Sequence, residues 1–543
     1  MTFFANVGIK VQQKLGINIE APDLSKCGVF KFKDETEERI EYLIKRIDVA
    51  TGHDEISSRL LKAAAPSILT NLKDLINLSY ETHIFPDSLK KATVKTLHKK
   101  GDYNNPAQYR PISILTTISK IFGRSATEQI MEFYKKTNKL STKQHAYRPQ
   151  HSTTTCLFEL TEAALKYIDE GYLVGIAALD LSKAFDSLAH NLILQKLLDM
   201  GLDGTAVTWI QSYLHQRKQT VKFGKIESDE ETVESGVPQG SILGPLLFIT
   251  CTNNIKDEMQ DYEIFSYADD MQILVKGRSI SEVEDKLEAA IKRANSYYNQ
   301  NSLLNNTTKT EVMLLGTKQR LDKTRRLKVR VNEDGKEKYI YGEPYLKILG
   351  IYIDQSLNWN KHISHAKKKA VNSIRNTHRA NKLLPMKQKR LLYNSLVTPH
   401  FTYGDIIWNK CGRANQNKLQ QAQNYAVKSI LGVHKYSSSK EALKKLDLLT
   451  LSEKRDIHAA VFVKKALTEN APTEIQLKYT NQQRPANLRQ CRLQTPTHKT
   501  KLYETGALYS SIQTWNSIPH DIKTTTSLNQ FKTSLQNLKL KAA

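Results

Sequence analysis

Apolar residues recur at helical spacing in the first part of the chain. Glu35–Ile47 has the apolar positions of an amphipathic helix, and Leu72–Tyr80 repeats the pattern. Between them, Ile56–Ala64 predicts another helix, which we expect Pro66 to end because proline has no backbone N–H to donate. The first part of the chain is therefore expected to be helical.

Short strand-like runs replace this pattern in the middle of the chain. Tyr172–Leu179 is almost wholly apolar, as expected of a central strand covered on both faces. The other strand-like runs are Val94–Gly101, Tyr109–Leu115, Thr308–Leu315, Lys323–Arg330, a solvated hairpin at Thr220–Val233, and Tyr345–Asp354, which should close the sheet. Helical spacing returns at Thr154–Asp169, Val207–Gln216, Ile280–Leu303 and Lys418–Leu431, with Gly432 as a natural stop. The mixture predicts an α+β fold with a mainly helical C-terminal region.

The segment Ile264–Val275 interrupts its apolar residues with Asp269 and Asp270. This pattern predicts a strand, a tight turn and a second strand, with two carboxylates at the tip of the hairpin. Adjacent anions beside a buried strand repel each other, and a divalent cation removes that cost because Mg²⁺ prefers carboxylate oxygens. The alternative is an ordinary polar turn, in which Asp is common.

Two further segments have the residue types of a functional site. Asp180 directly follows the apolar strand, where open α/β sheets place functional groups, although it could instead cap the following helix. Ser235–Pro245 is a Gly- and Pro-containing loop that leads into an apolar helical stretch. Its Gly236 and Gly240 would let the backbone approach a ligand closely.

Composition makes nucleic acid the expected partner. A chain of 543 residues predicts about two to four domains, and its net charge of +25 is typical of polyanion binders, although a merely basic protein is the alternative. Arg110 and Arg148 suit a triphosphate or a backbone phosphate, or else are solvated surface charge. Residues 471–543 hold ten Lys or Arg against three Asp or Glu, which could track nucleic acid or act as a solubilising surface.

The remaining features disfavour other classes of protein. Five scattered cysteines predict neither a disulfide framework nor a zinc site. The longest apolar run, Ile242–Cys251, is interrupted by Gly244 and Pro245 and is too short to span a bilayer. We therefore expect an intracellular protein of the nucleus and cytoplasm, with no membrane partner.

Taken together, these motifs resemble those of reverse transcriptases from non-LTR (LINE-type) retrotransposons, with jockey-like elements similar in pattern. The resemblance extends over nearly all of residues 30–543. The segments that carry it are Tyr109–Ser113, Arg148–Thr153, Leu179–Asp186, Ser235–Pro245, Ser266–Met271, Leu349–Asp354, Leu392–Pro399, Tyr403–Gly404, Trp408 and Trp515–Pro519.

The resemblance implies a right-hand polymerase fold. Residues 1–78 would be a helical N-terminal extension of the fingers, 79–354 the fingers and palm, 355–435 a helical thumb and 436–543 a basic C-terminal region. The implied activity is that of an RNA-directed DNA polymerase, a nucleotidyltransferase that extends the 3′-OH of a DNA primer or target DNA. Its partners would be an RNA template and deoxynucleoside triphosphates.

The resemblance also implies roles for individual residues. Asp180, Asp269 and Asp270 would hold two Mg²⁺ ions, for which Mn²⁺ can substitute, and Lys309 would protonate the departing pyrophosphate. The nucleotide-binding residues would be Arg110, Arg148, Phe185, Gln239 and Gly240. Among these, Phe185 would be the steric gate that rejects a 2′-OH, Arg148 would grip the triphosphate, and Gln239 and Gly240 would line the nucleotide and template pocket.

Several positions depart from the family pattern. His145 and Ala146 stand where Phe-Gly is usual, Glu55 replaces a usual glycine, and Gly123 takes the place of an acidic residue. The residues upstream of the fingers lack the endonuclease of jockey-like elements, so we expect extension of an existing 3′ end without its creation. The alternatives are a catalytically decayed or co-opted nucleic-acid-binding protein and a group II intron maturase, from which Trp515–Pro519 differs.

Overall fold

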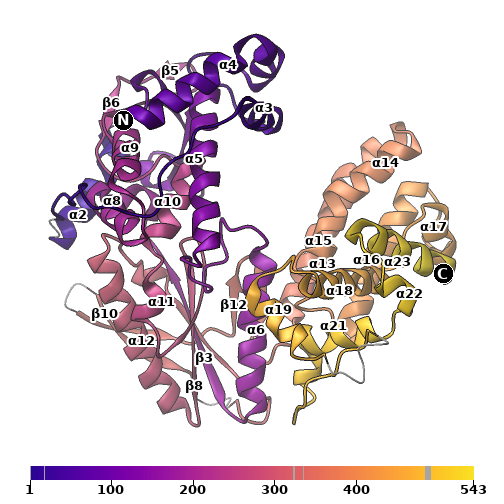
Figure 1. The fold of residues 1–543 in the computed structure, drawn as a ribbon. Helices are drawn as coiled ribbons and strands as arrows, with labels where there is room; N and C mark the ends of the chain where they lie inside the picture. Colours follow the sequence, from indigo (N-terminus) through magenta and orange to yellow (C-terminus); the bar gives the residue numbers. More distant parts are fainter. Residues whose placement is uncertain (1, 17–18, 322–324, 334–335, 484–490, 543) are drawn as a thin grey trace. The chain divides into compact units, whose positions relative to one another are not determined.

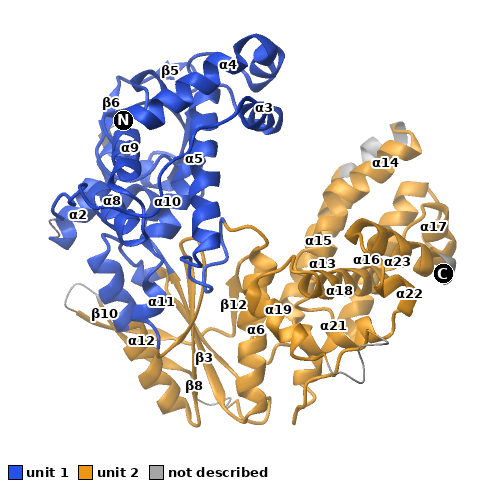
Figure 2. Cartoon of the chain, viewed as in Figure 1, with its two compact units in different colours: residues 1–147, 180–260, 292–308 blue, residues 148–179, 261–291, 309–543 orange. Residues whose placement is uncertain are grey.

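The computed structural model describes residues 2–16, 19–321, 325–333, 336–483 and 491–542, and many of its helices and strands are labelled in Figure 1. The chain forms two compact units (Figure 2). Unit 1 comprises residues 1–147, 180–260 and 292–308, and unit 2 comprises residues 148–179, 261–291 and 309–543. Both units combine segments distant in sequence. The four-part division into fingers extension, fingers and palm, thumb and C-terminal region remains a prediction.

Unit 1 is mainly helical. Its helices are α1 (Thr2–Ala5), α2 (Val7–Leu15), α3 (Glu37–Arg46), α4 (Ser58–Thr82), α5 (Thr117–Lys136), α7 (Ala184–Ser187), α8 (His190–Asp199), α9 (Gly204–Leu214), α10 (Leu243–Cys251) and α11 (Ile255–Glu258). An aromatic core joins them: the ring of Trp209 lies 5.1 Å from Phe32, 5.3 Å from Tyr80 and 5.5 Å from Phe85, centroid to centroid. The predicted helices at Glu35–Ile47 and Val207–Gln216 are confirmed.

One helix replaces two that the sequence predicts. Pro66 lies inside α4 instead of ending it. Proline frees the carbonyl group four residues earlier, here that of Lys62, and both Pro66 and Lys62 are exposed. Water can therefore hydrate the freed carbonyl group, and burial of Leu61, Leu72 and Ile76 on the opposite side keeps the helix continuous.

The sheet of unit 1 brings together two separate parts of the chain. Its strands are β1 (Lys91–His98), β2 (Tyr109–Leu115), β4 (Arg217–Phe223), β5 (Ile226–Glu227) and β6 (Glu231–Val233). β1 is antiparallel to β2 and parallel to β4, which is in turn antiparallel to β5 and β6. A hairpin is present within Thr220–Val233 as part of a larger sheet, but its turn lies at Gly224 and Lys225, between β4 and β5, and not at the acidic residues around Asp229 where the sequence predicted its tip.

The sheet of unit 2 has the order β7-β8-β3-β9. Its strands are β7 (Glu263–Tyr267), β8 (Asp270–Gly277), β3 (Leu173–Asp180) and β9 (Glu311–Leu315). Leu173–Ala177 and Leu179 of β3 are buried, which confirms the central strand predicted from its apolar sequence. Helix α6 (Thr153–Asp169) packs against β7 and β8. The division between the units falls within α12 (Ile280–Gln300).

Two hairpins of unit 2 form separate two-stranded sheets, although each contacts β9. We expected Tyr345–Asp354 to close the sheet of unit 2, but β12 (Tyr345–Ile348) and β13 (Ile351–Asp354) pair with each other as a separate two-stranded sheet. Leu349 and Gly350 both have positive φ angles, 45° and 87°, and such a two-residue turn folds a chain back on itself. The second hairpin pairs β10 (Lys328–Glu333) with β11 (Lys336–Tyr341). The first residues of the predicted strand Lys323–Arg330 lie outside the described part of the chain.

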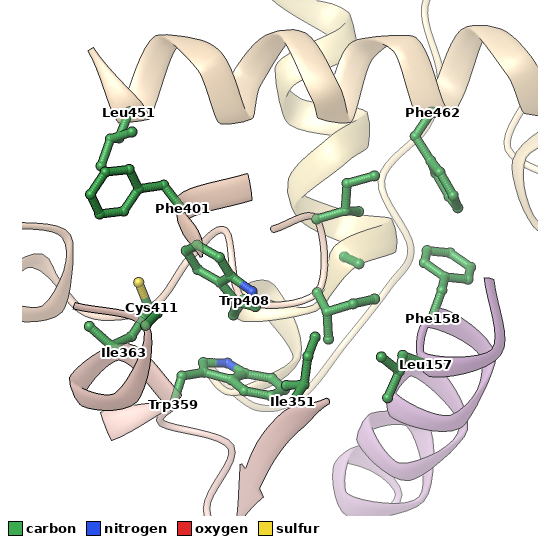
Figure 3. Packing of buried hydrophobic residues seen from close by; sticks show 14 of the residues in the cluster. Leu157, Phe158, Ile351, Trp359, Ile363, Phe401, Trp408, Cys411, Leu451 and Phe462 are labelled. Atoms are coloured by element: carbon green, nitrogen blue, oxygen red, sulfur yellow. The ribbon is translucent and has the colours of Figure 1, made fainter. Parts of the chain in front are cut away.

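In its described residues, the rest of unit 2 consists mainly of helices. They are α13 (Asn360–Leu383), α14 (Met386–Leu392), α15 (Thr398–Thr402), α16 (Arg413–Leu431), α17 (Ser439–Lys445), α18 (Leu451–Leu467), α19 (Thr473–Thr480), α21 (Ala507–Asn516), α22 (His520–Lys523) and α23 (Leu528–Ala542). Trp359, Phe401, Trp408 and Phe462 lie in their common core with Phe158 of α6 (Figure 3). The predicted helix at Lys418–Leu431 is confirmed, and Gly432 ends it with a φ of 68°.

Across the described part of the chain, every helix is too short or too polar to cross a lipid bilayer.

Candidate functional site

The hairpin that carries Asp269 and Asp270 has the geometry the sequence predicts. Tyr267 pairs with Asp270, so Ala268 and Asp269 form the turn, in which Ala268 has a φ of 57°. Asp269 is half-buried and Asp270 is exposed. The repulsion between the two anions is therefore reduced, because the turn lies beyond the buried residues of both strands and water screens the charge of Asp270.

Asp180 is the last residue of β3, and β3 is the neighbour of β8, which begins at Asp270. The backbone carbonyl group of Asp180 accepts a hydrogen bond from the N–H of Asn306 at 2.8 Å. Asp180 does not cap the next helix, since the N-cap of α7 is Lys183. Asp180 falls in unit 1, whereas Asp269 and Asp270 fall in unit 2.

Two basic residues of the predicted site lie in unit 2. Lys309 ends a short 3₁₀ turn, Thr307–Lys309, and so precedes β9 instead of starting it as the sequence predicted. Arg148 is half-buried, and this burial lowers the pKa of its guanidinium group, while the charges of Glu474 and Glu159 act in the opposite direction. Its predicted contact with a triphosphate remains a prediction.

The other predicted nucleotide-binding residues lie in unit 1. The ring of Phe185, on α7, is stacked on Phe248 of α10 with a centroid distance of 4.7 Å. The side-chain amide of Gln239 donates a hydrogen bond of 2.7 Å to Oδ1 of Asp186, so α7 and the Ser235–Pro245 loop are joined. Arg110 is exposed on β2, opposite Leu97 of β1.

The glycines of the Ser235–Pro245 loop are required by the fold of the chain itself. A Cβ atom on Gly236 would lie 2.7 Å from the backbone of Asp186, and one on Gly240 would lie 2.5 Å from the carbonyl oxygen of Ser113. Their φ angles, 75° and 125°, also disfavour other residues. Both glycines thus allow a close approach to this chain's own backbone, and their approach to a ligand stays a prediction.

Asp186 is a residue of this site that sequence reasoning did not single out. Burial raises the pKa of its carboxyl group, and the hydrogen bond from Gln239 and the charges of Lys183 and Lys99 act in the opposite direction. The signal available in the sequence was its position immediately after Phe185. The carboxyl group of Asp186 accepts a hydrogen bond from Gln239, and Asp186 follows Phe185 in the chain. Asp186 therefore links two predicted nucleotide-binding residues.

A pocket of about 580 Å³, open solvent included, lies beside the hydrogen-bonded pair Asp186 and Gln239. Its lining includes Phe4, Ser113, Asp186, His190, Arg217 and Gln239. Arg217 is buried: its guanidinium group donates a 3.0 Å hydrogen bond to the carbonyl oxygen of Tyr213 and lies over that residue's ring. The pocket is lined by residues of unit 1 alone.

The chemistry of the donor set suits a divalent cation. Within the described ranges, no three His, Cys, Asp or Glu side chains are gathered closely enough to hold a metal ion by themselves. Mg²⁺ needs no such cage, because it is commonly bound by one or two carboxylates together with substrate phosphates and water. The accessible carboxylates of Asp269 and Asp270 are donors of that kind.

Comparison with known proteins agrees with this arrangement. Residues 97–353 match the family described as reverse transcriptase (RNA-dependent DNA polymerase), whose members generally depend on divalent metal ions. The chain is 25% identical to the probable RNA-directed DNA polymerase from transposon X-element of Drosophila melanogaster, over 76% of this chain and 45% of that protein. It is 25% identical to the probable RNA-directed DNA polymerase from transposon BS of the same organism, over 78% of this chain and 48% of that protein.

A third relative is the RNA-directed DNA polymerase from mobile element jockey of Drosophila melanogaster. The two are 24% identical over 77% of this chain and 46% of that protein. The chain thus spans about half the length of these three curated relatives.

Proposed function

We propose that this chain is a reverse transcriptase related to those of non-LTR retrotransposons, and that it extends a DNA 3′-OH by copying an RNA template with deoxynucleoside triphosphates. The family match over residues 97–353 supports this proposal, and the single structural observation that carries it is the strand order of unit 2. That order makes β3, which ends at Asp180, the neighbour of β8, which begins at Asp270 after the Asp269 turn.

The carboxylates of Asp180, Asp269 and Asp270 would hold two Mg²⁺ ions, with Mn²⁺ as a possible substitute. When bound, these ions would supply activation of the primer 3′-OH and neutralisation of charge on the transferred phosphoryl group. The chain's own contribution is to position oxygen donors at a rigid turn between two paired strands, which limits the reorganisation needed during reaction. Lys309 would deliver a proton to the departing pyrophosphate.

Substrate selection would depend mainly on residues of unit 1. Phe185 would exclude a ribose 2′-OH, and Gln239 and Gly240 would line the nucleotide and template pocket. The hydrogen bond between Gln239 and Asp186 supports this role because it holds the Ser235–Pro245 loop next to the gate residue. Arg110 and Arg148 would contact the triphosphate.

Primer extension on an RNA template with Mg²⁺ tests the proposed function. We expect Asp269→Asn to reduce the extension rate by at least about 10³-fold, because loss of a carboxylate weakens the metal site that stabilises transition-state charge. Binding of the primer-template should persist, since Lys and Arg contacts to phosphates carry it.

Asp285→Asn is the matched control, because Asp285 is an exposed aspartate on α12 of the same unit. It should extend at the wild-type rate. Wild-type extension by Asp269→Asn would rule out the metal assignment, and absence of extension by the unmodified protein would favour a nucleic-acid-binding role instead.

A further inference from the structure

The N-terminal helices α1 and α2 pack directly on the predicted nucleotide-binding segments. Gly8 of α2 is buried, and a Cβ atom built on it would lie 2.2 Å from both the carbonyl oxygen of Asp186 and the Oγ of Ser235. No side chain fits in that space. The backbone of α2 therefore contacts the α7 turn and the first residue of the Ser235–Pro245 loop at the same point.

Neighbouring side chains extend this contact. The amide of Gln12 donates a 3.5 Å hydrogen bond to the carbonyl oxygen of Ser187. The Lys183 ammonium group lies 4.3 Å from the ring centroid of Phe3. Phe4 contributes to the lining of the same pocket as Asp186 and Gln239. The two short helices thus contact both ends of α7 and one wall of the pocket.

Hydrogen bonds join the segments beneath these helices to each other. The N–H of Val237 donates to the carbonyl oxygen of Phe185 at 2.9 Å, and the N–H of Gly236 donates to that of Leu188 at 2.7 Å. Gln239 adds its bond to Asp186. Because Phe185 and the loop depend on each other in this way, displacement of either segment moves the gate candidate relative to the pocket.

We propose that α1 and α2 form a positioning clamp that holds the Ser235–Pro245 loop against α7, and that this clamp sets the discrimination between deoxyribonucleotides and ribonucleotides. The second half of the proposal rests on the proposed function. Gly8 is a positioning residue here, because its contacts are with Asp186 and Ser235 and its effect on a nucleotide would pass through Phe185 and Gln239.

Gly8→Ala tests the clamp. Alanine favours the helical conformation over glycine, so the substitution favours α2 itself while forcing it away from Asp186 and Ser235. Amide hydrogen exchange at Gly236 and Val237 should become at least about tenfold faster, because exchange reports local opening of their hydrogen bonds. Gln13→Ala, at an exposed position of the same helix, is the control and should leave exchange unchanged.

Nucleotide kinetics provide the second measurement. In Gly8→Ala we expect a higher KM for deoxynucleotides. The ratio of kcat/KM for deoxyribonucleotides to kcat/KM for ribonucleotides should decrease by roughly tenfold. The affinity for primer-template should stay unchanged. A purely structural role would lower the amount of active enzyme without changing that ratio.

The two measurements separate the possible failures. Unchanged exchange in Gly8→Ala overturns the clamp, and faster exchange with an unchanged nucleotide ratio overturns its role in discrimination. If the unmodified protein extends no primer, the proposed function fails and exchange alone still decides whether the clamp exists. Should Gly8→Ala not fold, the double variant Phe3→Ala/Gln12→Ala removes the two side-chain contacts without a clash, and it is expected to change exchange and discrimination in the same direction.

Discussion

Phe185 is half-buried and has aromatic neighbours on two sides. Its ring stacks on Phe248 and meets the ring of Tyr147 edge-on at 6.4 Å. Such packing restricts the orientation of the ring, and a gate has to be rigid to discriminate between two sugars that differ by one hydroxyl group. The packing is therefore compatible with the role proposed from the position of Phe185 in the chain.

Replacement of this ring gives a test at the scale of one residue. Phe185→Ala should raise the kcat/KM for ribonucleotides relative to deoxyribonucleotides by about 10- to 100-fold, because the clash with the 2′-OH disappears. Single-nucleotide incorporation kinetics with both sugars measure the ratio. Phe223→Ala, which removes an exposed phenylalanine from β4 of the same unit, is the control. An unchanged ratio in Phe185→Ala would make Phe185 an ordinary packing residue.

Glu55 shows how a departure from the family pattern is accommodated at one residue. The resemblance predicts a glycine at this position, and the φ angle of Glu55, 57°, lies in the left-handed region that glycine adopts without strain. Its N–H donates to the carbonyl oxygen of Gly52 at 3.2 Å, so the turn forms nonetheless. The fold thus tolerates the substitution at a local conformational cost of about 1 kcal/mol.

Helix α6 links the sheet of unit 2 to the C-terminal helices. Its Asp169 carboxylate accepts hydrogen bonds from the N–H groups of Lys499 and Thr500 at 2.9 and 2.7 Å, and from the Thr500 hydroxyl group at 2.7 Å. Glu162 accepts a hydrogen bond from the N–H of Leu508 at 3.0 Å, at the start of α21. The basic C-terminal region is therefore partly built into unit 2, beside the helix that packs on β7 and β8.

The Asp169 contacts predict a pH-dependent contribution to stability. Burial acts to raise the pKa of this carboxyl group, but the hydrogen bonds from Thr500 and Lys499 outweigh it and lower the pKa below 3.8. A lowered folded-state pKa stabilises the fold above the unfolded-state pKa, and this stabilisation is lost as pH falls through the folded-state value.

Asp169→Asn should therefore reduce the free energy of unfolding by about 1–2 kcal/mol at pH 7, because the hydrogen bonds lose their charge. The difference in free energy of unfolding between Asp169→Asn and wild type should become smaller below about pH 4, where the carboxyl group of Asp169 begins to be protonated. Denaturant unfolding at several pH values measures it. Glu170→Gln, which removes an adjacent carboxylate with an exposed 3.6 Å ion pair to Lys276, should change stability by less than about 1 kcal/mol. If both variants lost the same free energy of unfolding at pH 7, the stabilising role assigned to the hydrogen bonds of Asp169 would be contradicted.

At the scale of the whole molecule, part of the chain's positive charge gathers around α13. Lys347, Lys361, Lys368 and Lys369 surround His365 of α13; burial and then the charges of these lysines lower the pKa of its imidazole. Lys361, Lys368 and Lys369 are exposed. A cluster of exposed lysines on one helix is typical of a surface that contacts nucleic-acid phosphates.

This cluster predicts a salt dependence that can be assigned to α13. Replacing Lys361, Lys368 and Lys369 with Gln should weaken primer-template binding and reduce the slope of log K against log salt concentration by up to about 3, since each phosphate contact contributes about 0.9. Binding titrations at several salt concentrations measure the slope. Gln replacements at Lys440, Lys444 and Lys445, on exposed positions of α17, are the matched control. An equal reduction in the control would mean that overall charge, and not this surface, governs binding.

The sequence by itself determined the elements whose signals are local. The apolar run of β3, the helical spacing of α16 with Gly432 after it, and the hairpin at Asp269 were all predictable because burial pattern and turn chemistry repeat over a few residues. The order of the motifs along the chain was also sufficient to indicate the family that residues 97–353 match. Pro66 marks the limit of local signals, because exposure on α4 decided that the helix continues.

Only the tertiary structure decided which distant segments meet. The parallel pairing of β1 with β4, the contact of Gly8 with Asp186 and Ser235, and the anchoring of Thr500 on Asp169 join residues that are far apart in the chain. Each depends on complementary surfaces that exist only after the separate elements have formed. Periodicity within one segment carries no information about its partner, so Asp186 and Gly8 acquire their importance from the packing of the folded chain.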